Sequence, residues 1–263
     1  MTHRFLDQPE VLRVLFHPKR DDSFDPLDPK TRPVAVEVEP AVFLRGWLYP
    51  ALPNSPAILF FHGHAEIAAD YDAFADFYIQ MGITFLAIDY RGYGASDGTP
   101  AASNLLCDAL KVFLAADRIF HSCRLAPKEL YVMGRSIGSA PAIEVAAHAS
   151  DKLAGLIVES GFAETKTLLD CLGMPVGEFD EKRDAFANSI KISRISIPTL
   201  IIHGKEDALI PPAQAQELYR RSAAQKKQLV LIPRGNHNTL MIAGISKQGK
   251  SPYFEAIRGF AGG

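Results

Sequence analysis

Ser136 lies within a Gly-x-Ser-x-Gly stretch, residues 134–138, in which a serine hydroxyl could act as a nucleophile. Residues 129–133 before it are typical of a buried strand, and residues 139–148 after it are small, apolar and helix-forming apart from Pro141. A strand that turns sharply into a helix around a serine is a nucleophile elbow, and its glycines leave room for the tight turn. The sequence therefore predicts Ser136 as an enzymatic nucleophile.

Such a serine needs a base to accept its proton, and the base histidine needs a carboxylate that fixes its tautomer. Asp207 lies just past the apolar run 199–204, and His237 lies in a turn-rich loop past the last apolar run, residues 228–232. The chain order Ser, acid, His is one of the orders in which these groups occur. Open α/β sheets also bind ligands past the carboxyl ends of their strands. We therefore predict Ser136, Asp207 and His237 as a catalytic triad.

Two other carboxylates compete for the role of the acid. Glu159 directly follows the apolar run 153–158, where some enzymes of this type carry their carboxylate, and Glu206 is the neighbour of Asp207. Asp207 could also be a helix N-cap or turn former, and His237 a loop histidine without a role. The order along the chain favours Asp207, and Glu159 stays as the alternative acid.

The negative oxygen that forms during acyl transfer needs two backbone N–H donors, which together make an oxyanion hole. Ile137 directly follows the nucleophile at the start of a helix and is predicted to supply one donor. The loop after the strand 57–61 should supply the other, and we predict His64, with Ala65 as the alternative if the turn lies one residue later. His62 is expected to brace this loop through hydrogen bonds.

Three further polar features are expected to be structural or without a role. Arg135 stands beside the nucleophile, and we expect its side chain to point away from the pocket. Residues 89–98 are rich in charge and glycine at a strand end, where they can satisfy turn backbone. Residues 62–66 resemble the start of a zinc-binding His-x-His run, but Ile67 stands where a further histidine would be, and no metal site is predicted.

The chain has 263 residues, of which 48% are hydrophobic, and this suits one α/β domain over residues 1–263 with an N-terminal arm over residues 1–33. A net charge of −2 without a basic cluster argues against nucleic acid and anionic membrane surfaces as partners. Residues 1–20 hold no apolar leader, and no stretch approaches the roughly 20 apolar residues of a spanning helix. The three cysteines are widely spaced, which predicts free thiols in a reducing compartment and a cytoplasmic protein.

Apolar runs of strand length alternate with longer amphipathic segments along the chain. We expect eight strands, the first two an antiparallel pair, over residues 34–39, 43–49, 57–61, 84–88, 130–133, 153–158, 199–202 and 228–232. Helices are expected over residues 71–81, 104–120, 136–148, 212–223 and 251–260. Runs that are apolar on both faces belong to parallel sheets covered by helices. The sequence thus predicts an α/β fold with a mostly parallel eight-stranded sheet flanked by helices.

Residues 161–198 interrupt this alternation, because they separate two buried strands by far more chain than a usual crossover needs. The segment is rather apolar up to Phe179 and charged over residues 180–184. We predict a small lid of one or two helices, inserted after the sixth strand. The alternative is an ordinary crossover helix with a long loop.

Five motifs occur in a fixed order along the chain: His-Gly at residues 62–63, the turn at 89–94, the elbow at 134–138, His-Gly-Lys-Glu-Asp at 203–207 and Asn-His at 236–237. In this order the chain resembles the α/β-hydrolase superfamily, in particular small-lid serine hydrolases similar to the depalmitoylase-like α/β-hydrolase-domain proteins. The resemblance implies a Ser-Asp-His triad, an acyl-enzyme intermediate and no cofactor.

Two departures from that family are visible in the sequence. The cysteine-rich N-terminal tail that anchors the mammalian depalmitoylases is missing, so the resemblance does not carry over a membrane anchor. His64 also occupies a loop position where relatives often carry a smaller or neutral polar residue.

The expected function is cleavage of carboxylic esters or thioesters, with a small-molecule ester or acyl compound as the partner. Apolar residues in segment 161–198 favour an acyl chain or another hydrophobic group on the substrate. A peptidase or amidase with the same triad is an alternative, since acyl-enzyme mechanisms serve both. A non-catalytic ligand-binding protein with this fold is a third. The sequence leaves acyl-chain length, the preference among ester, thioester and amide, and oligomeric state open.

Overall fold

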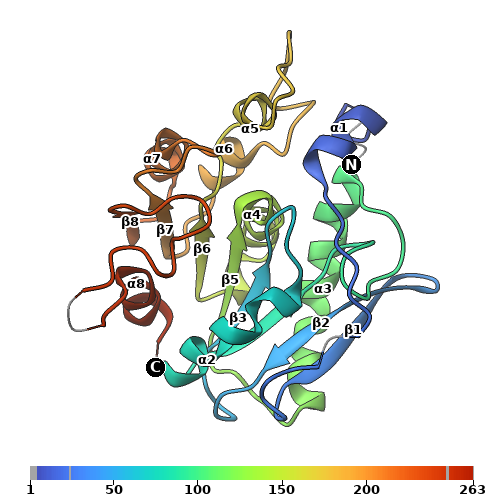
Figure 1. Ribbon diagram of the computed structural model, residues 1–263, viewed down its shortest axis with the longest axis vertical. Helices are drawn as coiled ribbons and strands as arrows, with labels where there is room; N and C mark the ends of the chain where they lie inside the picture. The colour runs from blue at the N-terminus through green and yellow to red at the C-terminus, as the bar shows by residue number, and fades with distance from the viewer. Residues whose placement is uncertain (1–4, 24, 247–248, 263) are drawn as a thin grey trace.

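One sheet of eight strands runs through the described part of the protein, a computed structural model of residues 5–23, 25–246 and 249–262 (Figure 1). The order of strands across the sheet is β1-β2-β4-β3-β5-β6-β7-β8. β1 pairs with β2, and β2 with β4, in antiparallel fashion, while the other five pairings are parallel. This confirms the predicted fold class, including the antiparallel first pair.

The strands follow the predicted apolar runs closely. Their bounds are β1 Arg32–Glu39, β2 Val42–Tyr49, β3 Ala57–Phe61, β4 Thr84–Ile88, β5 Leu130–Arg135, β6 Gly155–Glu159, β7 Thr199–Gly204 and β8 Lys227–Ile232. Every residue of β3, β4, β6 and β7 is buried, as expected for inner strands covered on both faces. β1 lies at one edge, and there buried and exposed residues alternate along most of the strand.

Helices cover both faces of the sheet. The α-helices are α1 Pro9–Leu15, α2 Asp72–Gln80, α3 Ala102–Ser122, α4 Ser139–His148, α5 Thr165–Cys171, α6 Asn188–Ile192, α7 Pro212–Arg221 and α8 Pro252–Ala261. Three short 3-10 turns add to them, η1 Ala68–Tyr71, η2 Ser136–Gly138 and η3 Ser150–Lys152. Buried residues of α3, α4 and α7 form one core with one face of the strands, and those of α2 and α8 form a second core on the other face.

The predicted irregular arm contains a helix that the sequence analysis missed. Within the described residues of the arm, which exclude 1–4 and 24, α1 spans Pro9–Leu15, and β1 begins at Arg32 rather than after the arm. Leu6, Val11 and Leu15 are fully buried in the core that α3 and α4 share. Pro9 occupies the first helical position, where a missing N–H costs least. Seven residues form only about two helical turns, and an apolar pattern of that length is too short to predict a helix.

Segment 161–198 holds two short helices, α5 and α6, joined by an irregular stretch. Figure 1 shows α1, α5 and α6 gathered at the same end of the molecule. The rings of Phe5 and Phe179 meet edge to face there, with centroids 5.3 Å apart, so that the N-terminal arm contacts the inserted segment. None of the helices in the described part of the chain combines the length and apolar character needed to cross a membrane.

Candidate active site

The turn between β5 and α4 places Ser136 at the carboxyl end of a central strand. β5 ends at Arg135, and Ser136 begins the 3-10 turn that leads into α4. Ser136 has a φ of 54°, in the left-handed region that a residue with a side chain rarely adopts. The hydroxyl of Ser139 donates to the carbonyl of Ser136 at 2.7 Å and helps to hold this conformation. The elbow therefore stores backbone strain at the residue predicted as the nucleophile.

The two glycines of the elbow are required by close backbone approach. A Cβ on Gly134 would lie 2.0 Å from the carbonyl oxygen of Gly138, and a Cβ on Gly138 would lie 2.2 Å from that of Phe61. Both distances are far below van der Waals contact, and both partners are backbone atoms that cannot turn aside. The absence of side chains thus lets the elbow pack against itself and against the end of β3.

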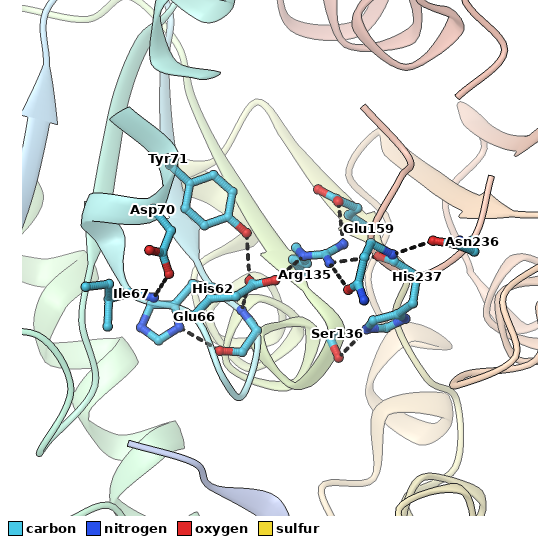
Figure 2. Close-up of polar contacts among 12 residues, drawn as sticks. His62, Glu66, Ile67, Asp70, Tyr71, Arg135, Ser136, Glu159, Asn236 and His237 are labelled. Carbon is cyan, nitrogen blue, oxygen red and sulfur yellow. Dashed lines mark hydrogen bonds and ion pairs between the residues drawn. The ribbon is translucent and has the colours of Figure 1, made fainter. Parts of the chain in front are cut away.

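His237 joins Ser136 to Asp207 in one chain of hydrogen bonds, and Figure 2 shows the contact between His237 and Ser136. Its Nε2 lies 3.0 Å from Oγ of Ser136, and its Nδ1 lies 2.8 Å from Oδ2 of Asp207. All three residues are buried, with at most 8% of their surface exposed. These are the contacts that a nucleophile, a base and an orienting acid need. The structure therefore brings together the three residues that the sequence analysis had selected.

The carboxylate of Asp207 accepts three hydrogen bonds and lies close to a second histidine ring. Its Oδ1 accepts the backbone N–H groups of Leu209 and Ile210 at 3.0 and 2.9 Å, while its Oδ2 faces the rings of His237 and His203. Burial alone would raise the pKa of Asp207, but hydrogen bonds from His203 and His237 and from the backbone hold it well below its usual range. Asp207 is thus ionised across the range of pH in which a histidine can act as a base.

The loops that carry Asp207 and His237 are bonded to each other. The N–H of Glu206 donates to the carbonyl of Gly235 at 2.9 Å, and the N–H of Lys205 donates to that of Ile232 at 3.0 Å. Gly204 has no room for a side chain either, since a Cβ would lie 2.2 Å from the Gly235 carbonyl oxygen. Backbone pairing beyond β7 and β8 therefore sets the distance between the two loops.

Glu159, the alternative acid, is directed to other partners. Its Oε1 accepts Nη1 of Arg135 at 2.9 Å, and its Oε2 accepts the hydroxyl of Tyr253 at 2.7 Å. The ring of His237 bonds Asp207 directly. Glu159 is linked to His237 only through Arg135, which bonds the Glu159 carboxylate and the His237 carbonyl. The geometry favours Asp207 over Glu159 as the partner of the base.

The loop after β3, residues 62–67, lies beside the elbow and carries the predicted second oxyanion donor. The N–H of Gly63 is taken by Oε2 of Glu66 at 2.7 Å, and the N–H of Ile67 by Asp70 at 3.0 Å. Within this described loop, the N–H groups of His64 and Ala65 are not used in these bonds. Neither N–H group donates to another described residue, so both predicted candidates stay open.

His64 and His62 behave differently in this loop. The His64 carbonyl accepts the hydroxyl of Tyr93 at 2.5 Å and the N–H of His17 at 3.2 Å, which fixes the peptide plane that follows it. Burial lowers the pKa of the His64 ring, and nearby His17 lowers it further, so the ring is neutral near pH 7. His62 is fully buried and bonds the Gly63 carbonyl at 2.7 Å, which is the bracing role expected of it.

Three residues near the site were missed or misjudged. Arg135 was expected to point away from the pocket, but its Nη2 donates to the carbonyl of His237 at 2.7 Å. Glu66 was considered only as part of a zinc run, yet it ties Gly63 to Arg135. His203 was treated as a strand residue, and its Nε2 lies 3.3 Å from Asp207. Two signals in the sequence could have pointed to these roles. Arg135 is a charged residue directly beside the elbow serine, and Glu66 is a glutamate in a short turn that contains a glycine.

The other polar features are structural. Asp89 accepts the N–H of Ala68 at 2.7 Å, and Arg91 is paired with Asp108 and Glu39 at 2.6 and 2.9 Å. Among the residues with described positions, no three His, Cys, Asp or Glu side chains are placed so that they could hold a metal ion.

Comparison with known proteins is consistent with this geometry. Residues 53–178 and 185–241, more than half of the chain, match the family described as serine aminopeptidase, S33. An uncharacterized protein of Escherichia coli, YfhR, is 28% identical over 237 residues, covering 87% of this chain and 81% of its own length. Human alpha/beta hydrolase domain-containing protein 17B is 34% identical over 201 residues, which cover 73% of this chain and 64% of the human protein.

Solved structures share the fold at lower identity. The esterase Pf2001 of Pyrococcus furiosus superposes with a TM-score of 0.70 at 20% identity, covering 93% of this chain and 99% of that one. A soluble variant of the monoglyceride lipase of Saccharomyces cerevisiae superposes with a TM-score of 0.68 at 13% identity, covering 94% and 97%. The chain therefore belongs to the serine aminopeptidase S33 family of hydrolases, within the α/β-hydrolase superfamily.

Proposed function

We propose that this protein is a serine hydrolase that cleaves carboxylic esters or thioesters through an acyl-enzyme intermediate. The observation that carries the proposal is the buried chain of hydrogen bonds from Ser136 through His237 to Asp207, at 3.0 and 2.8 Å. A serine at a strained elbow, in contact with a base that a carboxylate orients, is the arrangement that acyl transfer needs.

In the proposed mechanism, Oγ of Ser136 attacks the acyl carbon while Nε2 of His237 takes the hydroxyl proton. The N–H groups of Ile137 and His64 stabilise the oxyanion, because the first N–H groups of a helix lack an intrahelical partner and the His64 N–H is unused. The tetrahedral intermediate then collapses, and His237 protonates the leaving alcohol or thiol. Water repeats the sequence, with His237 again as the base, and releases the acid and free Ser136.

Segment 161–198, with α5 and α6, is proposed as a small lid over the site. Leu168 and Leu169 anchor it in the core, while Leu172 and Phe179 are only half-buried. Half-buried apolar side chains of a lid would suit an acyl chain or another hydrophobic group of the substrate. Two of the structural neighbours are an esterase and a lipase, which agrees with this substrate class.

A peptidase or amidase is the second candidate, and the description of the matching family as serine aminopeptidase favours it. The same triad can serve both reactions, so a substrate panel must separate them. A non-catalytic ligand-binding role gains no support from a site in which nucleophile, base and acid are all present and bonded.

The cysteines Cys107, Cys123 and Cys171 are free thiols, which supports the proposal of a reducing, cytoplasmic location.

A fluorophosphonate probe tests the nucleophile directly, because it labels only an activated serine. Wild-type protein should be labelled, Ser136→Ala should not, and Ser193→Ala should be labelled like wild type, because Ser193 is exposed on the end of α6. Folded wild-type protein that resists labelling would contradict the proposal. Initial rates on p-nitrophenyl acetate, butyrate and octanoate, an acyl thioester and an aminoacyl p-nitroanilide then separate esterase, thioesterase and peptidase activity.

A further inference from the structure

Arg135 places a buried guanidinium directly beside the proposed nucleophile, and this group donates hydrogen bonds to three partners. Its Nε donates to Oε1 of Glu66 at 2.8 Å, its Nη1 to Oε1 of Glu159 at 2.9 Å, and its Nη2 to the carbonyl of His237 at 2.7 Å. Figure 2 shows Arg135 between Glu66 on one side and Glu159 and His237 on the other, with Ser136 close by. One side chain therefore bonds both the loop after β3 and the loop that carries His237.

On its first side, Arg135 reaches the loop that carries the proposed oxyanion donor. The carboxylate of Glu66 accepts Nε of Arg135 through one oxygen, and through the other it accepts the N–H of Gly63 and the hydroxyl of Tyr71, both at 2.7 Å. Gly63 directly precedes His64, so the position of the Glu66 carboxylate sets the path of the backbone into the oxyanion hole.

On its second side, Arg135 holds the loop that carries the base. Nη2 bonds the main chain of His237 itself, and it also lies 3.4 Å from the side-chain oxygen of Asn238. A charged donor to a carbonyl is a strong hydrogen bond where water is excluded. The contact fixes the main chain from which the His237 ring projects toward Ser136.

Glu159 on the third side supplies charge balance and a fixed anchor. It is fully buried at the end of β6, and the hydroxyl of Tyr253 donates to its free oxygen at 2.7 Å. Tyr253 in turn bonds the hydroxyl of Tyr78 at 2.9 Å, which ties the cluster to α8 and α2. Glu159 thus ties the guanidinium to β6 and, through the two tyrosines, to α8 and α2.

We propose that Arg135 is a positioning residue that sets the oxyanion loop and the His237 loop at a fixed separation around Ser136. The inference rests on the proposed function and adds to it the residue that aligns its parts. A planar guanidinium can bond partners in three directions at once, whereas the ammonium of lysine is a compact point charge. Small displacements of reacting groups, on the order of 1 Å, can lower a rate by about 100-fold.

A purely structural ion cluster would be the alternative role, and the chain contains a matched control for it. Arg91 is also buried and also pairs with two carboxylates, Asp108 at 2.6 Å and Glu39 at 2.9 Å. Within the described residues, the hydrogen bonds of Arg91 go to these two carboxylates and not to the loops of His64 or His237. Loss of Arg91 should therefore affect stability alone, whereas loss of Arg135 should affect stability and turnover.

Arg135→Met removes the guanidinium and keeps an extended side chain. A cavity of about 160 Å³ borders Arg135, Glu66 and Glu159 on the side of Leu240 and Met241, so a methionine has room to settle. Because two buried carboxylates would lose their partner, the triple variant Glu66→Gln, Arg135→Met, Glu159→Gln is made as well. This variant removes all three charges, so we expect it to fold even if Arg135→Met alone does not.

The measurements are kcat and KM for p-nitrophenyl butyrate, or for whichever substrate wild type turns over best, together with Tm. We expect kcat to fall about 100-fold in Arg135→Met and about 10-fold in Arg135→Lys, with KM changed less than about threefold. Arg91→Met should lower Tm and keep kcat within about threefold of wild type. The triple variant should regain Tm and remain slow.

A kcat close to the wild-type value in folded Arg135→Met, or in the triple variant, would overturn the inference. Arg135 would then be a structural charge without a role in turnover. An equal loss of kcat in Arg91→Met would overturn it too, because the effect would then be general. Failure of the proposed function is distinguished by wild type itself, which would show neither turnover nor labelling by fluorophosphonate.

Discussion

Nε2 of His203 lies 3.3 Å from Oδ2 of Asp207, the same carboxylate oxygen that accepts the hydrogen bond of His237. His203 is fully buried on β7 and also bonds the carbonyl of Ile210 at 2.8 Å. The proposed acid thus faces a histidine of the strand that precedes it as well as the proposed base.

Removal of the His203 ring should loosen the orientation of the Asp207 carboxylate while the carboxylate itself stays in place. We expect His203→Leu to lower kcat about tenfold with KM nearly unchanged, because Asp207 keeps its backbone donors but loses one that fixes Oδ2. Steady-state kinetics on a p-nitrophenyl ester measure this. His148→Leu, at the exposed end of α4, is the matched control and should keep wild-type kcat. Equal kcat in wild type and His203→Leu would show that the second histidine is irrelevant to the acid.

The identity of the acid can be tested by two isosteric amides. Asp207→Asn should lower kcat by about 10³- to 10⁴-fold, because an amide no longer stabilises the tautomer and the charge that His237 needs. Glu159→Gln keeps one acceptor oxygen for Arg135 and gains an amide N–H that can donate to the hydroxyl of Tyr253, so kcat should fall by roughly tenfold at most. The two kcat values are compared under one assay. The assignment of Asp207 fails if only the Glu159 variant loses turnover.

A methyl group at the elbow should be incompatible with its packing. Gly138→Ala would place a Cβ 2.2 Å from the carbonyl oxygen of Phe61, so we expect the free energy of unfolding to fall by at least about 3 kcal/mol. Gly259→Ala, in α8 with open space around it, should instead raise stability by about 0.5–1 kcal/mol. Urea unfolding measures both variants, and equal stabilities would refute the packing argument.

Stability toward acid should depend on Glu66. Burial opposes its ionisation, but Arg135, Tyr71 and the Gly63 N–H lower the pKa of Glu66 from 4.5 to about 2. The unfolded carboxyl binds a proton below pH 4.5 and the folded one only near pH 2, so falling pH favours unfolding in this window. Wild type should lose roughly 2–3 kcal/mol between pH 5 and pH 2 through this group.

The measurement is the free energy of unfolding of wild type and Glu66→Gln at several values of pH. Glu66→Gln should be less stable than wild type at pH 7, because Arg135 loses a charged partner, and the difference should shrink toward pH 2. Glu10→Gln, on the exposed face of α1, is the control and should follow wild type throughout. Parallel curves for wild type and Glu66→Gln would show that the group does not contribute.

The proposed lid should influence which acyl chains are accepted. Phe179→Ala removes the edge-to-face contact with Phe5 and an apolar surface of segment 161–198, so kcat/KM for p-nitrophenyl octanoate should fall several-fold more than for the acetate. Phe77→Ala, on an exposed position of α2 against Phe254, should leave the ratio unchanged. An unchanged ratio in Phe179→Ala would argue for an ordinary crossover.

Much of the fold followed from the sequence because the inner strands are short, apolar and fully buried. The runs at 57–61 and 84–88 were predicted to the residue as β3 and β4, since burial on both faces leaves no room for polar residues. α1 was missed because its seven residues bury only one narrow stripe. A pattern of that length cannot be separated from an irregular arm.

The sequence by itself determined the chemistry on offer: an elbow serine between two glycines, then an acidic loop and a histidine loop in the order of a hydrolase. Only the tertiary structure decided which groups meet, because strand order and loop pairing bring Asp207 rather than Glu159 to His237. The same holds for Arg135, whose partners lie 69, 24 and 102 positions away in the chain. Periodicity records burial along one element, whereas the partner of a buried charge depends on elements that meet only in the folded sheet.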